Sequence, residues 1–352
     1  MDSFNCSNST IKLAGKITKG DIVVTMVTSC LSISGAFAIF FTSGHKVYRG
    51  RSLSEPRKLL VYLTIADLFI AIGCLIGAVR FLRDNVDMSE HNSPNYEVKD
   101  PVCIAQSFVT TMASLCSFWW TSIIAFNFWW TYTCFTNNNS VFGSNNISSR
   151  QSTRNVKIYV YHILSWIIPA IIIVTALSND ALGSDNSVES GPWCWISANM
   201  SVREQTIWMA VTGKGWEILM YLSCFGFYML LKLFQLSERR RQKQIHAQFG
   251  STTPLISRTR CYQQPPEHKL SYIFLWVVEI VLRISGTVRF VMATLRRHAC
   301  ISPPFYEHAD VYLMHVQSFG DSAQAFCSFL IFCVFRRCFR HINDRRSNNN
   351  LL

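Results

Sequence analysis

The residues of this chain with the clearest capacity for chemistry are charged side chains that interrupt long apolar stretches. An Arg, Lys or Asp at the centre of a bilayer costs about 2.5 to 3.5 kcal/mol. Seven such residues would together cost on the order of 20 kcal/mol, more than the stability of an ordinary fold, so they must face inward and pair or meet water. They are Asp67, Lys214, Glu217, Glu279, Arg283, Arg289 and Asp321.

The spacing of these charges places several of them on shared helix faces. Lys214 and Glu217 are three residues apart, and Glu279 and Arg283 are four apart, with Trp276 on the stripe of the second pair. Both pairs therefore point into one interior. The sequence predicts a polar pocket there, in the outer half of a helical bundle.

Two interpretations of these charges remain open. In the first, they form a ligand-binding or switch site. In the second, they are buried salt bridges that fix helix register, such as Glu217 with Arg283 and Lys214 with Asp321. For Asp67, an inward acid on the second helix, a structural or switch role is favoured over ligand contact.

The elements that must position these residues are seven apolar runs. Each is about long enough to cross a hydrocarbon core roughly 30 Å thick as a helix of about 20 residues. The sequence therefore predicts an all-α, seven-transmembrane helix bundle. The runs are Ile22–Ser43, Leu59–Val79, Val102–Thr133, Ile158–Leu177, Thr206–Phe234, Leu270–Leu295 and Val311–Phe335.

The charges of the connecting segments predict the orientation of the bundle. The loops beginning at His45, Cys134 and Lys232, together with the tail from Arg336, hold 21 Lys or Arg against 4 Asp or Glu. The other segments hold 9 against 13, so the first set is expected in the cytosol and the N-terminus outside. The net charge of +12 then reflects topology and attraction to anionic lipid of the bilayer, with no nucleic-acid partner.

Three regions follow from this pattern. Residues 1–21 form a short extracellular tail, residues 22–335 the bundle, and residues 336–352 a membrane-surface helix and cytoplasmic tail. Residues 1–20 contain polar residues throughout, so no cleavable signal peptide is expected. The connecting segments hold too few apolar residues for a soluble domain, and function is expected in the bundle and its loops.

Four cysteines fall on the predicted outer side, where disulfides form. Cys103 stands at the outer start of the third helix and Cys194 lies in the long loop after the fourth, so a bridge between them would tie that loop over the bundle. We predict this disulfide. For Cys6 and Cys300, a second bridge and two free thiols both remain open.

Acceptor motifs for N-glycosylation provide a check on the orientation. Asn5, Asn8 and Asn199 fall outside and are predicted to carry glycans, in a glycoprotein of the plasma membrane. Asn138 and Asn146 fall inside and are predicted to stay unmodified.

The residues that several known kinds of site require are missing from this sequence. The last helix contains no Lys for a retinal Schiff base, and only His162 and His315 among nine histidines lie within apolar runs, which is too few for a zinc hydrolase. No catalytic triad, phosphate-binding glycine loop or paired-cysteine metal motif is present. The chain is therefore not expected to be an enzyme, and no cofactor or metal is expected.

Several motifs carry a resemblance to a known family. The third-helix cysteine with Trp193-Cys194-Trp195, the run from Thr212 to Glu217 and the run from Arg283 to Phe290 resemble a G-protein-coupled receptor of the group between secretin-like and cyclic-AMP-type receptors. The third helix lacks the Asp/Glu-Arg-Tyr motif and the seventh lacks Asn-Pro-x-x-Tyr, so the likeness is not to rhodopsin-like members. The short tail before the first helix lacks a hormone-capturing domain.

The resemblance implies a receptor in which an unidentified extracellular ligand, bound in the bundle, activates a heterotrimeric G protein. Lys214, Glu217, Arg283 and Arg289 are then expected to form the pocket or its latch, and Cys338 is a palmitoylation candidate. A multi-pass transporter or channel that uses the intramembrane charges remains the alternative. The residues expected to contact the G protein are Arg49, Arg239, Arg240, Arg241 and Lys269.

Overall fold

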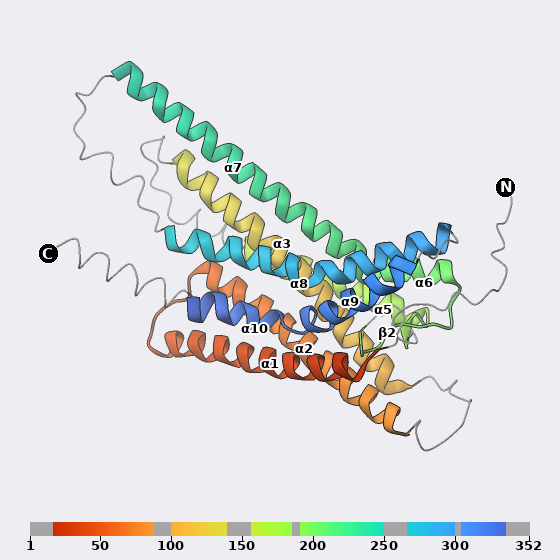
Figure 1. Ribbon diagram of the computed structural model, residues 1–352. Helices are drawn as coiled ribbons and strands as arrows, with labels where there is room; N and C mark the ends of the chain where they lie inside the picture. The colour runs from red at the N-terminus through yellow and green to blue at the C-terminus, as the bar shows by residue number, and fades with distance from the viewer. Residues whose placement is uncertain are drawn as a thin grey trace.

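The computed structural model describes residues 17–87, 100–138, 156–184, 191–249, 266–299 and 304–335. Over these ranges the chain is a bundle of long helices with one short hairpin (Figure 1). A capping box begins the first helix, because the Asp21 amide donates to Thr18 Oγ1 and the Thr18 amide donates to the Asp21 carboxylate, at 3.2 and 2.9 Å. The first three helices are α1 (Lys19–Tyr48), α2 (Glu55–Asp87) and α3 (Pro101–Asn138).

The fourth helical span, Val156–Ser178, contains a π-helical turn at Ile163–Ile167 followed by α5 (Ile168–Ser178). Pro169 lies at the start of α5, where its ring and missing N–H are incompatible with a regular preceding turn, so the wider turn accommodates it. A hairpin follows, in which β1 (Leu182–Gly183) pairs antiparallel with β2 (Trp195–Ile196).

The fifth span is one continuous helical stretch with an irregular turn. It consists of α6 (Val202–Met209), a π-helical turn at Ala210–Lys214, and α7 (Gly215–Phe249), whose far end extends beyond the neighbouring helices in Figure 1. The indole N–H of Trp216 donates to the Val211 carbonyl at 2.8 Å, which satisfies a backbone acceptor within the irregular turn. The next helix, α8 (Pro266–Ala299), packs against both α7 and the last span.

The last predicted run, Val311–Phe335, is two helices rather than the single one expected. α9 (Pro304–Gly320) and α10 (Gln324–Phe329), the latter continued by a π-helical turn at Leu330–Phe335, meet at a bend of 57°. Gly320, the last residue of α9, packs against the backbone of α8, where a Cβ would lie only 1.9 Å from the Leu282 carbonyl oxygen. The close approach of the two helices therefore requires glycine at this break.

Hydroxyl groups of α1 stabilise the broken helix. Thr25 donates to the Ser318 carbonyl at 3.2 Å, and Ser32 donates to the Ser322 carbonyl at 2.5 Å while accepting from the Phe326 amide at 3.3 Å. These bonds replace helical hydrogen bonds that the bend removes, since a buried backbone group without a partner is costly.

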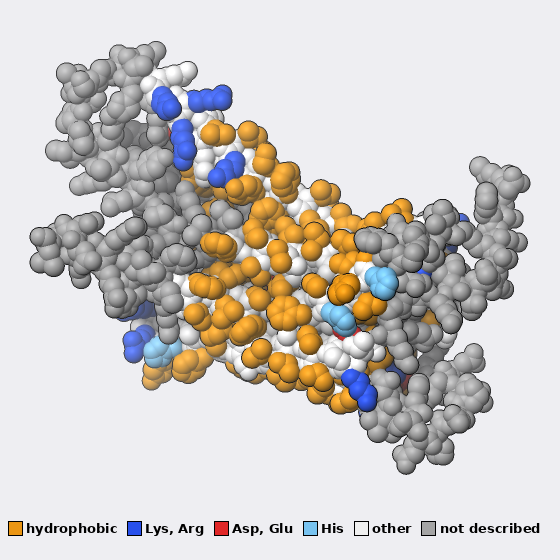
Figure 2. Space-filling model, viewed as in Figure 1, with side chains coloured by type: hydrophobic (Ala, Val, Ile, Leu, Met, Phe, Trp, Pro, Cys, Tyr) orange, Lys and Arg blue, Asp and Glu red, His pale blue; other side chains and the backbone are white. Residues whose placement is uncertain are grey.

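The bundle has the composition of a membrane protein. Five described helices are long and apolar enough to cross a membrane, or six if α9 and α10 form one broken span. α8 has 34 residues but carries Glu279, Arg283 and Arg289, and it is not among these helices. Figure 2 shows apolar side chains across the middle of one face, with Lys and Arg toward its two ends and more of them on the side where α7 projects. The chain is therefore an all-α membrane bundle.

The two ends of the bundle differ in their residues. The disulfide end is the end that holds Cys103 and Cys194, and the basic end is the end of α7 that holds Arg239 to Arg241. Between them, an apolar layer of Leu115, Phe118, Met220 and Cys224 fills the interior between α3 and α7. Phe118 of this layer lines one cavity and Cys224 lines another.

Candidate functional site

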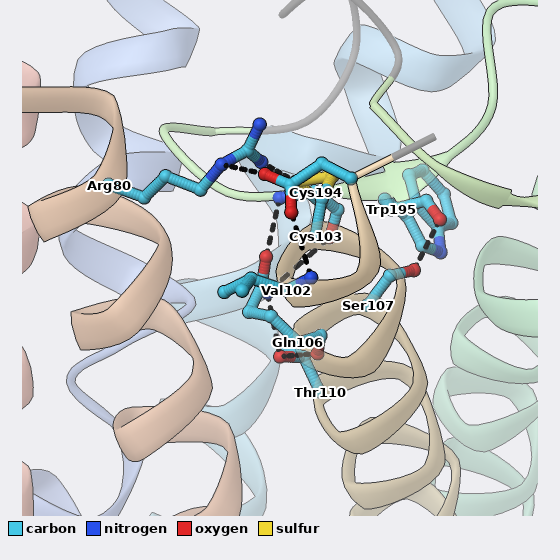
Figure 3. The surroundings of a disulfide bond; sticks show 9 residues. Arg80, Val102, Cys103, Gln106, Ser107, Thr110, Cys194 and Trp195 are labelled. Carbon is cyan, nitrogen blue, oxygen red and sulfur yellow. Dashed lines mark hydrogen bonds and ion pairs between the residues drawn. A yellow bond between two sulfur atoms is a disulfide. The ribbon is translucent and has the colours of Figure 1, made fainter. Parts of the chain in front are cut away.

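At the disulfide end, the loop before β2 is fixed on α3. Cys103, in the first turn of α3, is joined to Cys194 with 5.5 Å between their Cα atoms (Figure 3). The Cys194 amide donates to Gln106 Oε1 at 2.8 Å, and Ser107 donates to the Trp195 carbonyl. The loop is thus held by one covalent bond and by hydrogen bonds with Gln106 and Ser107, and it covers the interior of the bundle.

Arg80 of α2 adds an ion pair beside the disulfide. Its Nε atom lies 2.8 Å from the Asp100 carboxylate, just before α3, and its Nη1 atom lies 2.8 Å from the sulfur of Cys194. Figure 3 shows the guanidinium reaching from α2 toward this junction. α2, α3 and the loop are therefore joined at one point.

Beneath the loop lies a cavity lined by charged residues from three elements, which we call the charged cavity. Its walls include Trp193 and Trp195 from the loop, Thr111 and Ser114 from α3, and Gln317 from α9. It offers about 60 Å³ to the centres of water-sized molecules, and since one water needs about 10 to 15 Å³ of this measure, it has room for a few waters or one small polar molecule. The charged side chains in its lining are Lys214, Glu217, Arg283 and Asp321.

Lys214 and Glu217 form a buried ion pair in this lining. Lys214 Nζ lies 2.8 Å from Glu217 Oε2, as their spacing of three residues predicts. The other carboxylate oxygen accepts hydrogen bonds from Tyr221, at 2.7 Å, and from Thr287 of α8. Glu217 therefore connects α7 to α8. Gly286 makes room for this pair, because a Cβ there would lie 2.8 Å from Lys214 Nζ.

Arg283 of α8 contacts charged, polar and aromatic side chains in the interior of the bundle. Its Nε atom lies 3.8 Å from Glu279 on the same helix, and its Nη2 atom donates to Gln324 of α10 at 2.6 Å. The guanidinium carbon lies 4.6 Å from the ring centre of Phe118, within the range of a cation–π contact. Arg283 thus joins α8 to α3 and to the helix after the break.

Arg289 is linked to the charged cavity through Gln317. It lies 2.8 Å from Asp310 of α9 and donates to Gln317 at 2.7 Å. Gln317 in turn donates to Asp321 at 3.2 Å. A polar chain therefore runs from Asp310 along α9 to the break at Asp321.

The two interhelical ion pairs proposed from sequence, Glu217 with Arg283 and Lys214 with Asp321, are not formed as direct salt bridges among the described residues. Lys214 pairs with Glu217 instead, and Arg283 lies nearest to Glu279. The reason is local spacing, because partners three or four residues apart on one helix meet without any helix movement.

The remaining predicted site residues lie at other depths. Asp67 is buried and accepts a hydrogen bond from Ser117 of α3 at 2.8 Å, and Glu279 is buried beside Arg283. Trp276 does not line the charged cavity but a second, apolar one nearer the basic end. The structure thus brings four of the eight predicted residues into one cavity and links Arg289 to it through Gln317.

Comparison with known proteins adds a family likeness to this geometry. No family model matches the chain. It is 25% identical over 288 residues to "G-protein coupled receptor 157" of Homo sapiens, covering 82% of this chain and 73% of that protein. The receptors of the same name from Mus musculus and Rattus norvegicus are 26% and 27% identical over 291 residues. This chain resembles a G-protein-coupled receptor. The likeness to G-protein coupled receptor 157 spans 82% of the chain in all three cases.

Several polar residues of the site escaped the sequence analysis. Asp310 lies one position before the predicted seventh helix and was counted with the loops. Gln317, Gln324 and Thr287 are uncharged, so a search for ionisable residues passed over them. A search for any polar side chain on the stripes of Arg283 and Asp321 would have found Thr287, Gln317 and Gln324.

The other predicted residues are placed as follows. Arg49 is exposed at the end of α1, Arg239, Arg240 and Arg241 are exposed on α7, and Asn199 is exposed after β2. The side chain of Lys269 and residues Asn5, Asn8, Asn146 and Cys338, as well as Cys6 and Cys300, lie outside the described part. Among the described residues, no group of three or more His, Cys, Asp or Glu could hold a metal ion.

Proposed function

We propose that this chain is a cell-surface receptor that converts binding of an extracellular ligand in the charged cavity into activation of a heterotrimeric G protein. The observation that carries the proposal is the charged cavity itself, which lies between a disulfide-tied loop and the break at Asp321. The similarity to G-protein coupled receptor 157 supports the same reading.

The composition of the charged cavity suits a small polar ligand. Its lining holds two cations and two carboxylates, so a small molecule that carries both signs of charge would meet complementary groups. The ligand can favour the active arrangement only by binding it more tightly than the resting one. Because Arg283 and Gln324 connect the cavity to α10, a change of contacts there has a path toward the basic end.

In this proposal the disulfide end faces outward and the basic end faces the cytosol, at the plasma membrane. The exposed Arg239, Arg240 and Arg241 then form part of the surface for the G protein, with Arg49 and Lys269. Residues 336–352 would form a membrane-surface helix and a cytoplasmic tail, with a palmitoyl group on Cys338 as an anchor.

Glycan mapping tests this orientation. Asn199 is exposed at the disulfide end, so we expect it to carry an N-glycan, as do Asn5 and Asn8. Glycosidase treatment should shift the electrophoretic mobility of Asn199→Gln by one glycan less than that of the wild type. Asn138→Gln should show the same shift as the wild type. A glycan on Asn138 or Asn146 would reverse the proposed orientation.

A panel of G-protein activation sensors tests the function. Glu217→Gln keeps the shape of the side chain but removes the charge that Lys214 pairs with. Since a hydrogen bond to a charged group contributes about 1.5 to 3 kcal/mol, we expect basal or extract-stimulated activation to fall about tenfold or more. Arg283→Ala should also lower G-protein activation.

Val281→Ala is the matched control, because Val281 is 60% exposed on the outer face of α8. It should signal like the wild type at equal surface expression. Ion or solute flux in proteoliposomes, without nucleotide exchange on any alpha subunit, would contradict the receptor proposal and support a transporter.

A further inference from the structure

Both cations in the lining of the charged cavity already have partners. Lys214 Nζ lies 2.8 Å from Glu217 Oε2. The guanidinium of Arg283 lies 3.8 Å from Glu279 and donates to Gln324 at 2.6 Å. A negatively charged ligand would therefore have to compete with carboxylates that are held three or four residues away on the same helix.

Asp321, at the break between α9 and α10, is the exception among the charged side chains of this lining. Its carboxylate accepts a hydrogen bond from Gln317 at 3.2 Å, but within the described ranges no Lys or Arg forms a salt bridge with it. The residue is only partly buried and lines the cavity, so a molecule in the cavity can reach it. A carboxylate in this position favours a positively charged partner.

The groups behind the lining add negative charge. Arg283 lies within electrostatic range of four carboxylates, and Lys214 is the other cation of this cluster. When every group is ionised, four negative charges therefore meet two positive ones. Since unbalanced buried charge is costly, a bound cation would lower this cost and a bound anion would raise it. The four carboxylates are those of Asp67, Glu217, Glu279 and Asp321.

Other groups in the lining suit an ammonium ion. A primary ammonium has three N–H donors, so it needs acceptors besides one carboxylate. Ser114 of α3 is half-buried in the lining, and Thr111, one turn earlier, is 3% exposed with a hydroxyl that has no hydrogen-bond partner among the described residues. Trp193 and Trp195 add aromatic rings, which attract cations.

The size of the cavity limits the ligand. About 60 Å³ is accessible to the centres of water-sized molecules, and one water needs about 10 to 15 Å³ of this measure. The cavity therefore holds about four to six waters, or a ligand with roughly as many non-hydrogen atoms.

We propose that the charged cavity binds a small primary amine in its ammonium form, whose N–H groups donate to the Asp321 carboxylate. The essential charge of the ligand is then positive, whether or not it also carries a carboxylate. This inference rests on the proposed function, since it assigns a ligand class to the same cavity, but binding can be measured without a G protein.

Saturation-transfer NMR on the full chain in phosphatidylcholine nanodiscs tests the proposal, with empty nanodiscs as the background. The probes are n-propylammonium, 1-propanol and propionate, which are nearly equal in size and differ in charge. Ligands this small bind weakly, with dissociation constants roughly between 0.1 and 10 mM, which this method detects. We expect saturable binding of n-propylammonium and at least tenfold weaker binding of the other two.

Asp321→Asn removes the charge but keeps an acceptor for Gln317. It should weaken n-propylammonium about 10- to 100-fold, as expected for a hydrogen bond to a charged group. Asp180→Asn is the matched control and should bind like the wild type. Asp180 is exposed in the turn before β1, and its φ of 53° is a left-handed conformation that Asn also adopts.

Ser114→Leu fills the cavity from α3 and leaves Asp321 in place. It should also reduce binding at least tenfold, and it decides the test if Asp321→Asn does not fold. Propionate binding as tight as that of n-propylammonium would overturn the sign of the ligand. Binding that Asp321→Asn and Ser114→Leu leave unchanged, or that Asp180→Asn weakens equally, would overturn the site.

The same measurements separate this proposal from the receptor proposal. Binding with the expected pattern, but without a response of any G-protein sensor, would support the ammonium site and contradict only the receptor function. G-protein activation by tissue extracts, without detectable binding of n-propylammonium, would overturn only the ammonium site.

Discussion

Replacing Arg283 with Met should cost about 3 to 5 kcal/mol of stability, the range expected when one partner of a buried ion pair is removed. Arg283 is 4% exposed, and Glu279 beside it is 2% exposed, so the carboxylate would lose its nearest cation in a site without bulk water. The hydrogen bond to Gln324 and the contact with Phe118 would disappear as well. The apparent melting temperature of the purified protein should fall by roughly 6 to 10 °C.

The double variant Arg283→Met with Glu279→Gln separates charge from packing. Since it removes the unpaired carboxylate, it should recover part of the lost stability, and the two substitutions should therefore be less than additive. Arg241→Met, on the exposed end of α7, should leave the melting temperature unchanged. If the loss of stability in the double variant equals the sum of the losses in the two single variants, Arg283 does not compensate the charge of Glu279.

Gly320→Ala should destabilise the bundle to a similar degree or more. The added Cβ would lie 1.9 Å from the carbonyl oxygen of Leu282 and 2.8 Å from its carbonyl carbon, both backbone atoms that cannot rotate away. α8 and α9 would have to separate, although the Arg289 bonds to Asp310 and Gln317 cross this interface. Overpacking alone costs about 1 to 3 kcal/mol, and the loss of these bonds adds to it.

Gly226→Ala is the matched control for this substitution. Gly226 lies within α7 and a Cβ there would meet nothing within 4 Å, so Ala should preserve stability or raise it by up to about 1 kcal/mol through helix propensity. Both variants are compared by yield of monodisperse protein and by melting temperature. A Gly320→Ala protein as stable as Gly226→Ala would show that the two helices do not approach closely at the break.

The sequence was sufficient for features set by local spacing. Six of the seven apolar runs fall within described helical spans, and the seventh covers α9 and α10 with the break between them. The three-residue interval between Lys214 and Glu217 predicted a shared face that the ion pair of 2.8 Å confirms. Helical periodicity carries this information within a single segment, so it needs no knowledge of which helices are neighbours.

The sequence was insufficient where partners come from different helices. The hydrogen bond between Ser32 and the Ser322 carbonyl joins residues 290 positions apart, and no local pattern indicates it. The break before α10 depends on such long-range bonds and on the contact of Gly320 with α8. For the same reason, Gln324 was not recognised as a partner of Arg283.

The proposed receptor function requires that the buried charges line a cavity that is open to an outside molecule and coupled to the basic end. Its most direct test is to react Ser114→Cys in intact cells with a membrane-impermeant methanethiosulfonate, since Ser114 lines the charged cavity. Ala125→Cys, in the second, apolar cavity, is the control. We predict that Ser114→Cys reacts and that its basal G-protein activation changes, while Ala125→Cys does neither. An unreactive Ser114→Cys at normal surface expression, or a reaction that leaves activation unchanged, would contradict the account.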